Sequence, residues 1–405
     1  MKASSVEVWL WLLLVMNPCN PKVHRLLEKY DSAEELCRAI RDGKCPNLTD
    51  AEKQRAANTR TREVRRIMEE CAAHSIRIIT LDDPEYPALL RHIYSPPVVL
   101  FVQGTLSGLD APNCAVPLAV VGPRSPSDTA VSAAKMLCSD LVKIGTVIIS
   151  GLAVGIDTIA HTCALNGGVP TVGVLACGSL VNYPSESEHL KQQIIENGGA
   201  VISELLLHTG VTGGYFRHRN RIISGLGLGT LVIEASTRSG CLLTANHAVE
   251  QGRDLFCVPP ADITRESCAG VVKYLRDGAA PVYDYLDIVR AYMPQYFGQE
   301  YAGESDEALS RKRQLRRSAK DQPAAPVKKL EASPAKPQRS PVNCAGLNEL
   351  QTKLVRLIEE RPQSADELID ATGLAYSQAA EALTELEILG LITLLPEGRY
   401  AAADK

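Results

Sequence analysis

The chain has 405 residues, of which 45% are apolar, so it can bury two or three separate cores. Its 43 Lys and Arg residues face 47 Asp and Glu residues, and the formal net charge of −4 excludes a general attraction for polyanions. A nucleic-acid site would therefore have to be a local concentration of positive charge. The 12 cysteines include no C-x-x-C pair, which argues against a zinc site or a disulfide framework and indicates a reduced, cytoplasmic protein.

The first 75 residues show a helical pattern of apolar positions and are expected to form an N-terminal helical domain. The apolar stretch 8–16 is too short to cross a bilayer, one lysine precedes it, and no small-x-small cleavage site follows it. Ser4 and Glu7 form an S-x-x-E capping box. We therefore expect a buried first helix rather than a membrane span or a signal peptide.

Residues 47–50 supply a cap, from which one long helix is predicted to run to about His74. Its basic side chains favour a solvated helical face over a face that contacts DNA. These side chains are Lys53, Arg55, Arg60, Arg62, Arg65 and Arg66.

Between residues 116 and 284, short apolar runs alternate with helical segments. Runs that are apolar at every position suit strands buried on both faces of a parallel sheet, with helices as right-handed crossovers. The predicted fold is therefore α/β, a Rossmann-like, doubly wound, mainly parallel sheet over residues 76–295, with ligands at the carboxyl ends of its strands. Strand-like segments at 76–81 and 98–102 extend this sheet at one edge. The runs are 117–121, 147–150, 171–177, 200–203, 230–235 and 254–259.

Residues 296–345 are predicted to form a basic, proline-rich linker. Between 308 and 341, ten Lys or Arg residues accompany five prolines and two acids. Such a segment is expected to be disordered and could hold phosphate backbones loosely, although solubility alone explains the charge equally well.

Residues 346–405 have the pattern of a winged helix: helices at 348–360, 364–372 and 377–389, then a strand pair over 391–401 turned at 396–398. The third helix carries Glu381, Glu385 and Glu387 and no Lys or Arg. Over 346–405, five basic residues face eleven acidic ones. Because phosphates would be repelled, a protein-binding or self-association role is favoured over docking in a DNA groove.

Two predicted strands run into glycine-containing turns that suit an anion. Arg124 lies in the turn G-P-R-S at 122–125, before a helix that should start near residue 127 or 128. Ser150, Gly151 and Gly155 lie in the turn S-G-L-A-V-G-I-D at 150–157. Glycine lets the backbone approach an anion, free amides at a helix start point toward it, and arginine can donate two hydrogen bonds to one phosphate.

Asp157 and His161 lie one helical turn apart after the second of these turns. They could form a metal site or an acid/base pair. A local role is favoured, in which Asp157 caps the helix start and His161 packs or hydrogen-bonds nearby.

Residues 216–221 read F-R-H-R-N-R, a dense positive cluster at a predicted loop-to-helix junction. Phe216 can stack a base while Arg217, Arg219 and Arg221 pair with phosphates, and Asn220 can bind backbone or base edges. For Phe216 a core position, and for Arg219 or Arg221 an internal ion pair, explain each residue about equally well on its own.

Ser239 and Gly240 supply a hydroxyl and free amides ahead of another helix. Because the carboxyl ends of parallel strands are neighbours in space, these turns should converge on one ligand with several phosphates. The sequence contains no Walker motif, and no G-x-G-x-x-G joins a strand to a helix, so no nucleotide cofactor is expected and no metal either.

An ordered set of motifs resembles the DNA-processing protein A family, also called Smf. They are G-P-R at 122–124, S-G-L-A-x-G-I-D-x-x-A-H at 150–161, Y-P at 183–184, S-E at 203–204, F-x-x-R-N-R-I-I-x-G-L at 216–226 and S-G-x-L-x-T-A-x-x-A at 239–248. D-P-E-Y-P at 83–87 is similar to a further family segment. The resemblance covers residues 83–279, about half of the chain.

The resemblance implies a protein that is not an enzyme, binds single-stranded DNA, forms a homodimer and helps to load the RecA recombinase during natural transformation or other recombination. It also implies an N-terminal helical (SAM-like) domain and a C-terminal winged helix. The residues carried over to the DNA site are Arg124, Ser150, Gly151, Gly155, Phe216, Arg219, Asn220, Arg221, Ser239 and Gly240, and Arg217 is added to this site for its charge.

The chain departs from the family pattern at three places: Val154 and Gly213-Gly214 stand where many members have a basic residue, and Pro259-Pro260 stands for proline-glycine. Arg217 and Arg238 could restore the missing charge. The alternative function is a Rossmann-like enzyme that processes nucleotides, with Glu204 or Glu234 at a strand end as its acid.

Overall fold

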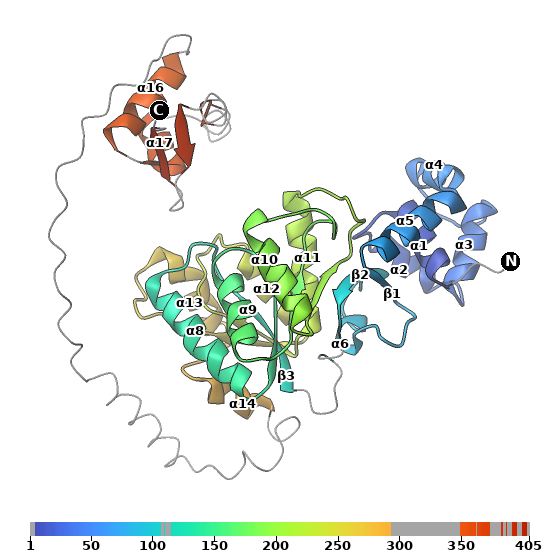
Figure 1. Ribbon diagram of the computed structural model, residues 1–405, viewed down its shortest axis with the longest axis horizontal. Coiled ribbons are helices and arrows are strands. Elements are labelled where there is room, and N and C mark those ends of the chain that lie inside the picture. Colours follow the sequence, from blue (N-terminus) through green and yellow to red (C-terminus); the bar gives the residue numbers. More distant parts are fainter. Residues whose placement is uncertain are drawn as a thin grey trace. The chain divides into compact units, whose positions relative to one another are not determined.

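The computed structural model describes residues 5–106, 109, 115–292, 349–361, 363–372, 382–383, 386, 391–394 and 399–402. The chain divides into two compact units, Met1–Leu309 and Ser310–Lys405. The predicted linker lies outside the described residues. In the first unit a layer of helices packs on one end of a large sheet (Figure 1).

The N-terminal layer is built around its first helix, which is apolar on all sides. Eight of the 12 residues of this helix are buried, and its neighbours pack around it. The indole of Trp9 donates a hydrogen bond to Asp82 Oδ2 at 2.9 Å, which ties the layer to the loop after β1. Within the described residues no helix has both the length and the apolar character to cross a bilayer. The helices are α1 (Ser5–Met16), α2 (Lys22–Leu27), α3 (Ala33–Arg41), α4 (Asp50–Asn58) and α5 (Thr61–Ala73).

The single long helix predicted to end near His74 is wrong, because the chain breaks between α4 and α5. Thr49 and Glu52 form a capping box at the start of α4, as the sequence suggested for that region. Thr59 and Arg60 then adopt extended backbone conformations. The indole of Trp11 donates to the carbonyl of Thr59 at 3.3 Å, so a tertiary contact takes up a carbonyl where the helix ends. The Ser4 half of the other expected capping box lies outside the described residues.

The sheet of the first unit has the predicted Rossmann-like arrangement. Within the described residues its strand order is β1-β2-β6-β5-β4-β3-β7-β8-β9. All pairs from β6 to β9 are parallel, whereas β1 and β2 add an antiparallel edge beside β6. The strands are β1 (Arg77–Thr80), β2 (Val99–Gly104), β3 (Ala115–Val121), β4 (Thr146–Ser150), β5 (Thr171–Val174), β6 (Ala200–Ser203), β7 (Gly229–Val232), β8 (Asp254–Cys257) and β9 (Ala280–Pro281).

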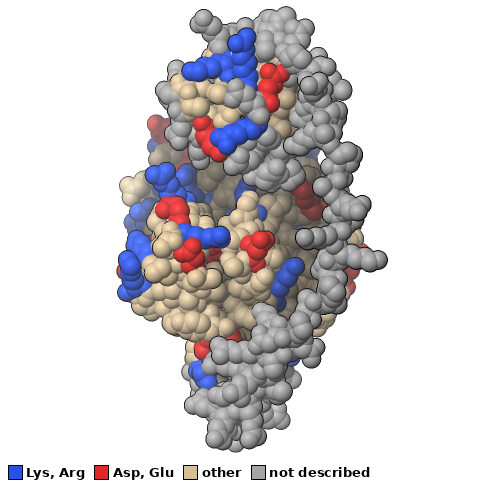
Figure 2. Space-filling model, turned by 90° about the vertical axis from the view of Figure 1, so that its left-hand side faces the viewer, with Lys and Arg blue, Asp and Glu red and all other residues tan. Residues whose placement is uncertain are grey.

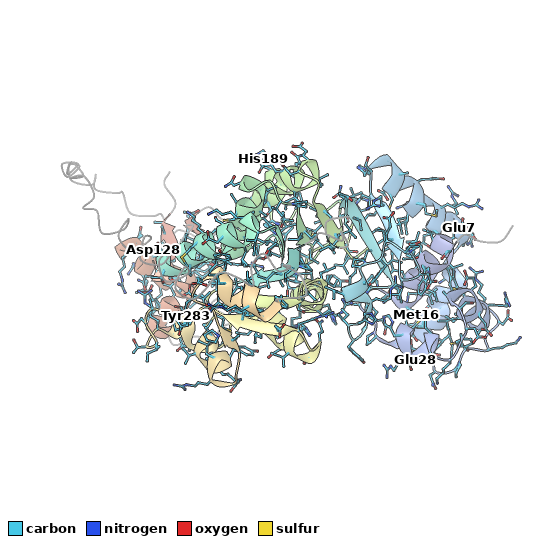
Figure 3. All side chains as sticks on the ribbon, turned by 90° about the horizontal axis from the view of Figure 1, so that it is seen from below. Glu7, Met16, Glu28, Asp128, His189 and Tyr283 are labelled. Carbon is cyan, nitrogen blue, oxygen red and sulfur yellow. The ribbon has the colours of Figure 1, made fainter. Side chains whose placement is uncertain are left out.

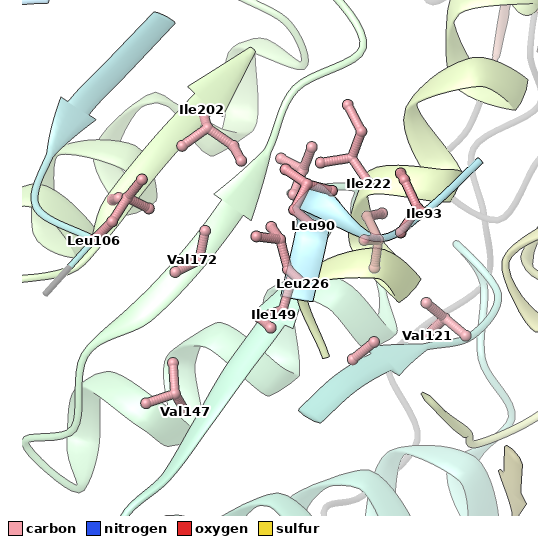
Figure 4. Close-up of a cluster of buried hydrophobic side chains, with 14 of the residues drawn as sticks. Leu90, Ile93, Leu106, Val121, Val147, Ile149, Val172, Ile202, Ile222 and Leu226 are labelled. Carbon is pink, nitrogen blue, oxygen red and sulfur yellow. The ribbon is translucent and has the colours of Figure 1, made fainter. Parts of the chain in front are cut away.

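Helices cover both faces of this sheet. On one face α8 and α9 lie side by side (Figure 1), with α14 beside α8. On the other face Leu90 and Ile93 lie against Ile222 and Leu226 of α11 (Figure 4), which docks α6 on the helix that follows β6. The helices are α6 (Ala88–Arg91), α8 (Asp128–Lys143), α9 (Ile156–Asn166), α10 (Glu188–Glu196), α11 (Gly213–Leu226), α12 (Cys241–Glu250), α13 (Ala269–Arg276) and α14 (Tyr285–Tyr292), with short 3-10 turns η1 (Ser185–Ser187) and η2 (Glu266–Cys268).

The two ends of the first unit differ in character. Glu7, Met16 and Glu28 mark the helical layer at one end, and Asp128 and Tyr283 mark the opposite end (Figure 3). The helical layer and the sheet share a hydrophobic cluster that includes Phe101 of β2, so the layer is part of the same packed body.

The second unit contains a small sheet with strand order β10-β12-β11. The predicted strand pair at 391–401 is confirmed, since Ile392 pairs with Ala402 and Leu394 with Tyr400. Most of the predicted helix 377–389 lies outside the described residues. The described elements are α16 (Glu349–Glu360), β10 (Gln363–Ser364), α17 (Ala365–Thr372), β11 (Ile392–Leu394) and β12 (Arg399–Ala402).

We predict that Leu12→Ala lowers the free energy of unfolding by about 2–5 kcal/mol, because Leu12 is fully buried and its removal leaves a cavity. Because the helical layer shares its core with β2, the sheet and the layer of the variant should unfold together, at a lower urea concentration than in the unmodified chain. Urea unfolding followed by circular dichroism measures the free energy of unfolding, and limited proteolysis at each urea concentration shows whether the sheet unfolds together with the helices. Met136→Ala on α8, where the side chain is 43% exposed, should change stability by no more than about 0.5 kcal/mol. Loss of the helices alone, with the sheet's midpoint unchanged, would contradict the prediction.

Candidate nucleic-acid interface

A hollow of about 450 Å³ lies at the carboxyl ends of the central strands. It is bounded by the turns after β3 and β7, the turn before α9, and the start of α11. The order of strands reverses between β3 and β7, and this is the place where open α/β sheets bind ligands. Seven of the predicted site residues line this space, which we call the Phe216 hollow: Arg124, Phe216, Arg217, Arg219, Asn220, Ser239 and Gly240.

Phe216 is the aromatic side chain of this hollow, and two guanidinium groups lie over its ring. The Cζ atom of Arg124 is 5.1 Å from the ring centroid and that of Arg219 is 5.8 Å away. The ring of Tyr183 meets Phe216 edge on, with centroids 5.9 Å apart. Phe216 is therefore half-buried, supported from its edge, and flanked by positive charge.

Arg219 is buried and its guanidinium is used internally. Nη1 donates to the carbonyl of Gly151 at 2.7 Å and to the carbonyl of Val174. Burial lowers the pKa of this guanidinium to about 10, while the nearby Asp157 carboxylate raises it, so Arg219 stays charged at neutral pH. The side chain thus fastens α11 to the ends of β4 and β5.

The turn between β4 and α9 fits closely around these groups. A Cβ at Gly151 would lie 2.5 Å from Arg219 Nη1. Gly155 has φ +89°, and a Cβ there would lie 2.5 Å from the carbonyl oxygens of Pro123 and Arg124. Both positions therefore require glycine, one for the buried arginine and one for contact with the neighbouring turn.

Asp157 and His161 have local roles, as the sequence favoured, but Asp157 does not cap the helix, because the N-cap of α9 is Gly155 and has no side-chain hydrogen bond. Asp157 Oδ2 accepts hydrogen bonds from the amides of Gly151 at 3.1 Å and Ala153 at 3.3 Å, so it shapes the turn. His161 Nδ1 lies 2.8 Å from Thr171 Oγ1. Burial lowers the pKa of His161 to about 3, which keeps the ring neutral.

Four predicted site residues are not in the lining of the Phe216 hollow: Gly151 and Gly155 of the turn described above, Arg221 and Ser150. Arg221 is buried on the opposite side of α11, where Nη2 donates to Glu204 Oε2 at 2.6 Å. Ser150 is fully buried and its hydroxyl donates to the carbonyl of Val120 at 2.6 Å. The sequence placed the arginines in one cluster because they alternate, but on a helix of 3.6 residues per turn Arg219 and Arg221 point about 200° apart.

The carboxylate partner of Arg221 joins α11 to the N-terminal layer. Glu204 Oε1 accepts a contact from Cys19 Sγ at 3.2 Å. Burial, followed by the Glu204 charge, raises the pKa of this thiol. The sequence left open whether Arg221 forms an internal ion pair or contacts a phosphate. In this structure it forms the internal ion pair.

Two arginines remain available to a ligand. Arg124 and Arg217 are exposed, and neither forms an ion pair with a carboxylate of the described residues. On the face shown in Figure 2, basic and acidic side chains lie interspersed among neutral ones, as the net charge of −4 suggests. The positive charge in the hollow is therefore local.

The start of α12 completes the wall opposite Arg124. Gly240 precedes the helix, and its carbonyl accepts a hydrogen bond from Asn220 Nδ2 at 3.3 Å. The hydroxyl of Ser239 lies 3.0 Å from Cys241 Sγ. Sequence reasoning missed Cys241 and Tyr183 as neighbours of the site. The Y-P motif at 183–184 was the signal that could have identified Tyr183.

Comparison with known proteins agrees with this architecture. The model of the family described as DNA recombination-mediator protein A matches residues 77–293, and the DprA winged helix domain matches residues 332–398. Protein Smf of Synechocystis sp. is 32% identical over 333 residues, which are 82% of this chain and 82% of that protein. DNA processing protein DprA of Bacillus subtilis is 33% identical over 223 residues, 55% of this chain and 73% of that protein.

A solved structure gives the same result. The X-ray structure of DNA processing protein A from Streptococcus pneumoniae superposes with a TM-score of 0.62 at 30% identity, covering 72% of this chain and 98% of that one. The C-terminal unit is accordingly a winged helix domain, as the sequence predicted. Because the family match spans more than half of the chain, the protein belongs to the DNA recombination-mediator protein A family, also known as DprA or Smf.

Proposed function

We propose that this protein binds single-stranded DNA in the Phe216 hollow and acts as a recombination mediator rather than as an enzyme. The observation that carries the proposal is the convergence of Arg124, Arg217 and Phe216 on one hollow at the reversal of strand order. Membership of a family of DNA-processing and recombination proteins supports it.

The aromatic ring favours an unpaired strand over a duplex. A base can stack on Phe216 only when it is not stacked between neighbouring base pairs, so a single strand offers the required face. Arg124 lies over the same ring and would then contact the phosphate or the base edge beside the stacked base.

The walls of the hollow supply groups for phosphates. Arg124 and Arg217 can each donate paired hydrogen bonds to a phosphate. The amides at the start of α12, after Gly240, add the positive end of a helix. The other predicted residues hold the walls in place. The buried Arg219 packs against the turn that contains Gly151 and Gly155. Inside the fold, Arg221 pairs with Glu204 and Ser150 bonds to Val120.

The biological role that follows is protection of an incoming single strand and its delivery to the RecA recombinase during natural transformation or related recombination, in the cytoplasm and by a homodimer. The winged helix, which is acidic over 346–405, would serve as a protein-binding or self-association module.

The rival proposal of an enzyme with Glu204 or Glu234 as its acid has less support. Glu204 is committed to Arg221 and Cys19 on the far side of α11. Glu234 holds the amide and hydroxyl of Ser127. Glu204 thus has structural partners at both of its oxygens, and Glu234 has them at Oε2 and no partner residue that would activate it as an acid among the described residues.

We predict that Arg124→Ala and Arg217→Ala each weaken binding of a labelled oligo(dT) and each lower the slope of log affinity against log salt by about 0.7, because one phosphate contact is lost. Fluorescence anisotropy at several salt concentrations measures both quantities. The control is Arg276→Ala, which removes an exposed arginine at the end of α13, outside the hollow. An unchanged slope in both hollow variants would refute the assignment.

Phe216→Ala should weaken oligo(dT) binding by about 1–3 kcal/mol, because the stacking surface for a base is lost. Its salt slope should stay close to that of the unmodified chain, since no charge is removed. Phe216→Tyr retains the ring and should recover most of the affinity. Thermal melting of both variants separates loss of stacking from loss of fold, and equal weakening by the two substitutions would argue against a stacked base.

A further inference from the structure

A second cavity, of about 330 Å³, lies next to the Phe216 hollow and has no part in the function proposed so far. We call it the Glu234 cavity. Cavities of about 300–1,000 Å³ are large enough to bury a small organic group. Its walls are mostly aliphatic and include Ala133 of α8, Ile233, Val258 and the paired prolines 259–260 that follow β8.

Glu234 is the buried polar group of this cavity, with 4% of its surface exposed. Its Oε2 atom accepts hydrogen bonds from Ser127 N at 3.0 Å and Ser127 Oγ at 3.1 Å. Among the described residues, the hydrogen bond that Oε1 accepts comes from the weak thiol donor of Cys268, at 3.8 Å. Oε1 therefore has capacity to accept a stronger donor from a ligand.

The charge of the Glu234 cavity is opposite to that of the Phe216 hollow. Glu234 and Asp262 contribute two carboxylates, and the single arginine of the lining, Arg265, lies 4.0 Å from Asp262. A phosphate would be repelled here, whereas a neutral flat group with hydrogen-bond donors would be accepted. The cavity therefore suits a nucleobase rather than a backbone.

The same two segments of chain form both spaces. After β3, residues 122–124 line the hollow and Ser127 lines the cavity. After β7, Glu234 lines the cavity, and Ser239 and Gly240 line the hollow. Arg124 and Ser127 are three residues apart, so their Cα atoms lie within about 11 Å. A strand of a few nucleotides spans this distance.

We propose that the Glu234 cavity binds a guanine base, with a neighbouring phosphate of the same strand held in the Phe216 hollow. Guanine presents two adjacent donors, N1–H and the N2 amino group, on its Watson–Crick edge. Adenine and cytosine place a ring acceptor beside their amino group, and thymine places carbonyls on both sides of N3–H. Oε1 of Glu234, the oxygen that Ser127 leaves open, can accept from both of these donors, whereas it would meet a lone pair on each of the other three bases, so it selects guanine. The aliphatic walls and prolines cover the faces of the base.

The inference rests on the proposed function, and one set of measurements separates the two. The full chain is titrated with labelled dT15, and with dT15 in which one central thymidine is replaced by deoxyguanosine, deoxyinosine or deoxyadenosine. We expect deoxyguanosine to tighten binding about tenfold, and deoxyinosine, which lacks the N2 amino group, to tighten it less. Failure of dT15 to bind overturns the proposed function, whereas equal binding of all four oligonucleotides overturns this inference alone.

Two variants test the site itself. Glu234→Gln places an amide where the carboxylate was, and the ratio of deoxyguanosine to thymidine affinity should fall toward one. Ala133→Leu leaves the carboxylate in place but fills the cavity, and it should lower the same ratio, so the test does not depend on one variant folding. Arg217→Ala is the matched control, because it should weaken both oligonucleotides and keep the ratio. A ratio that persists in both cavity variants overturns the assignment.

A free nucleotide could supply the same guanine. Deoxyguanosine monophosphate and deoxyadenosine monophosphate are therefore each added alone in a thermal-shift assay. Stabilisation by the guanine nucleotide only, abolished in Glu234→Gln, supports the site with a free nucleotide as the source. A preference seen only within the oligonucleotide supports the strand as the source, and stabilisation by both nucleotides equally contradicts selection by the carboxylate.

Discussion

The architecture of the candidate site depends on one buried cation, the guanidinium of Arg219. It donates to the carbonyls of Gly151 and Val174, at the ends of two neighbouring strands, and it lies close to the buried Asp157 carboxylate. Removing a charge from water is costly unless it is hydrogen-bonded and has an opposite charge nearby, and the two carbonyls and Asp157 supply these. The position of α11 over the sheet, and hence the position of Phe216, follows from this arrangement.

Arg221, on the other side of the same helix, has a similar internal role. Its ion pair with Glu204 lies where Cys19 of the helical layer reaches the sheet, so three parts of the first unit meet there. With these two arginines committed inside, the positive groups that face a ligand are Arg124 and Arg217. A chain with net negative charge thus obtains a local basic site from two exposed side chains and the ends of helices.

The sequence predicted the sheet well and the site only in part. Uninterrupted apolar runs, such as those now seen as β4 and β7, have few alternatives to strands buried on both faces. The break before Arg60 was missed because it depends on Trp11, nearly 50 residues earlier in the chain. Arg221 was assigned to the DNA site because spacing alone does not show that residue 216 already lies within a helix, nor that Glu204 is near. Tertiary contacts decide both outcomes.

We expect Arg219 to hold the site together without itself contacting DNA. The most direct measurement is the free energy of unfolding of Arg219→Met without DNA, compared with Arg217→Met. Because two carbonyls and Asp157 would lose their buried partner, we expect the first variant to lose about 3 kcal/mol or more and the second to lose almost nothing. An Arg219→Met protein as stable as the unmodified chain, with only a reduced salt slope for oligonucleotide binding, would contradict this account.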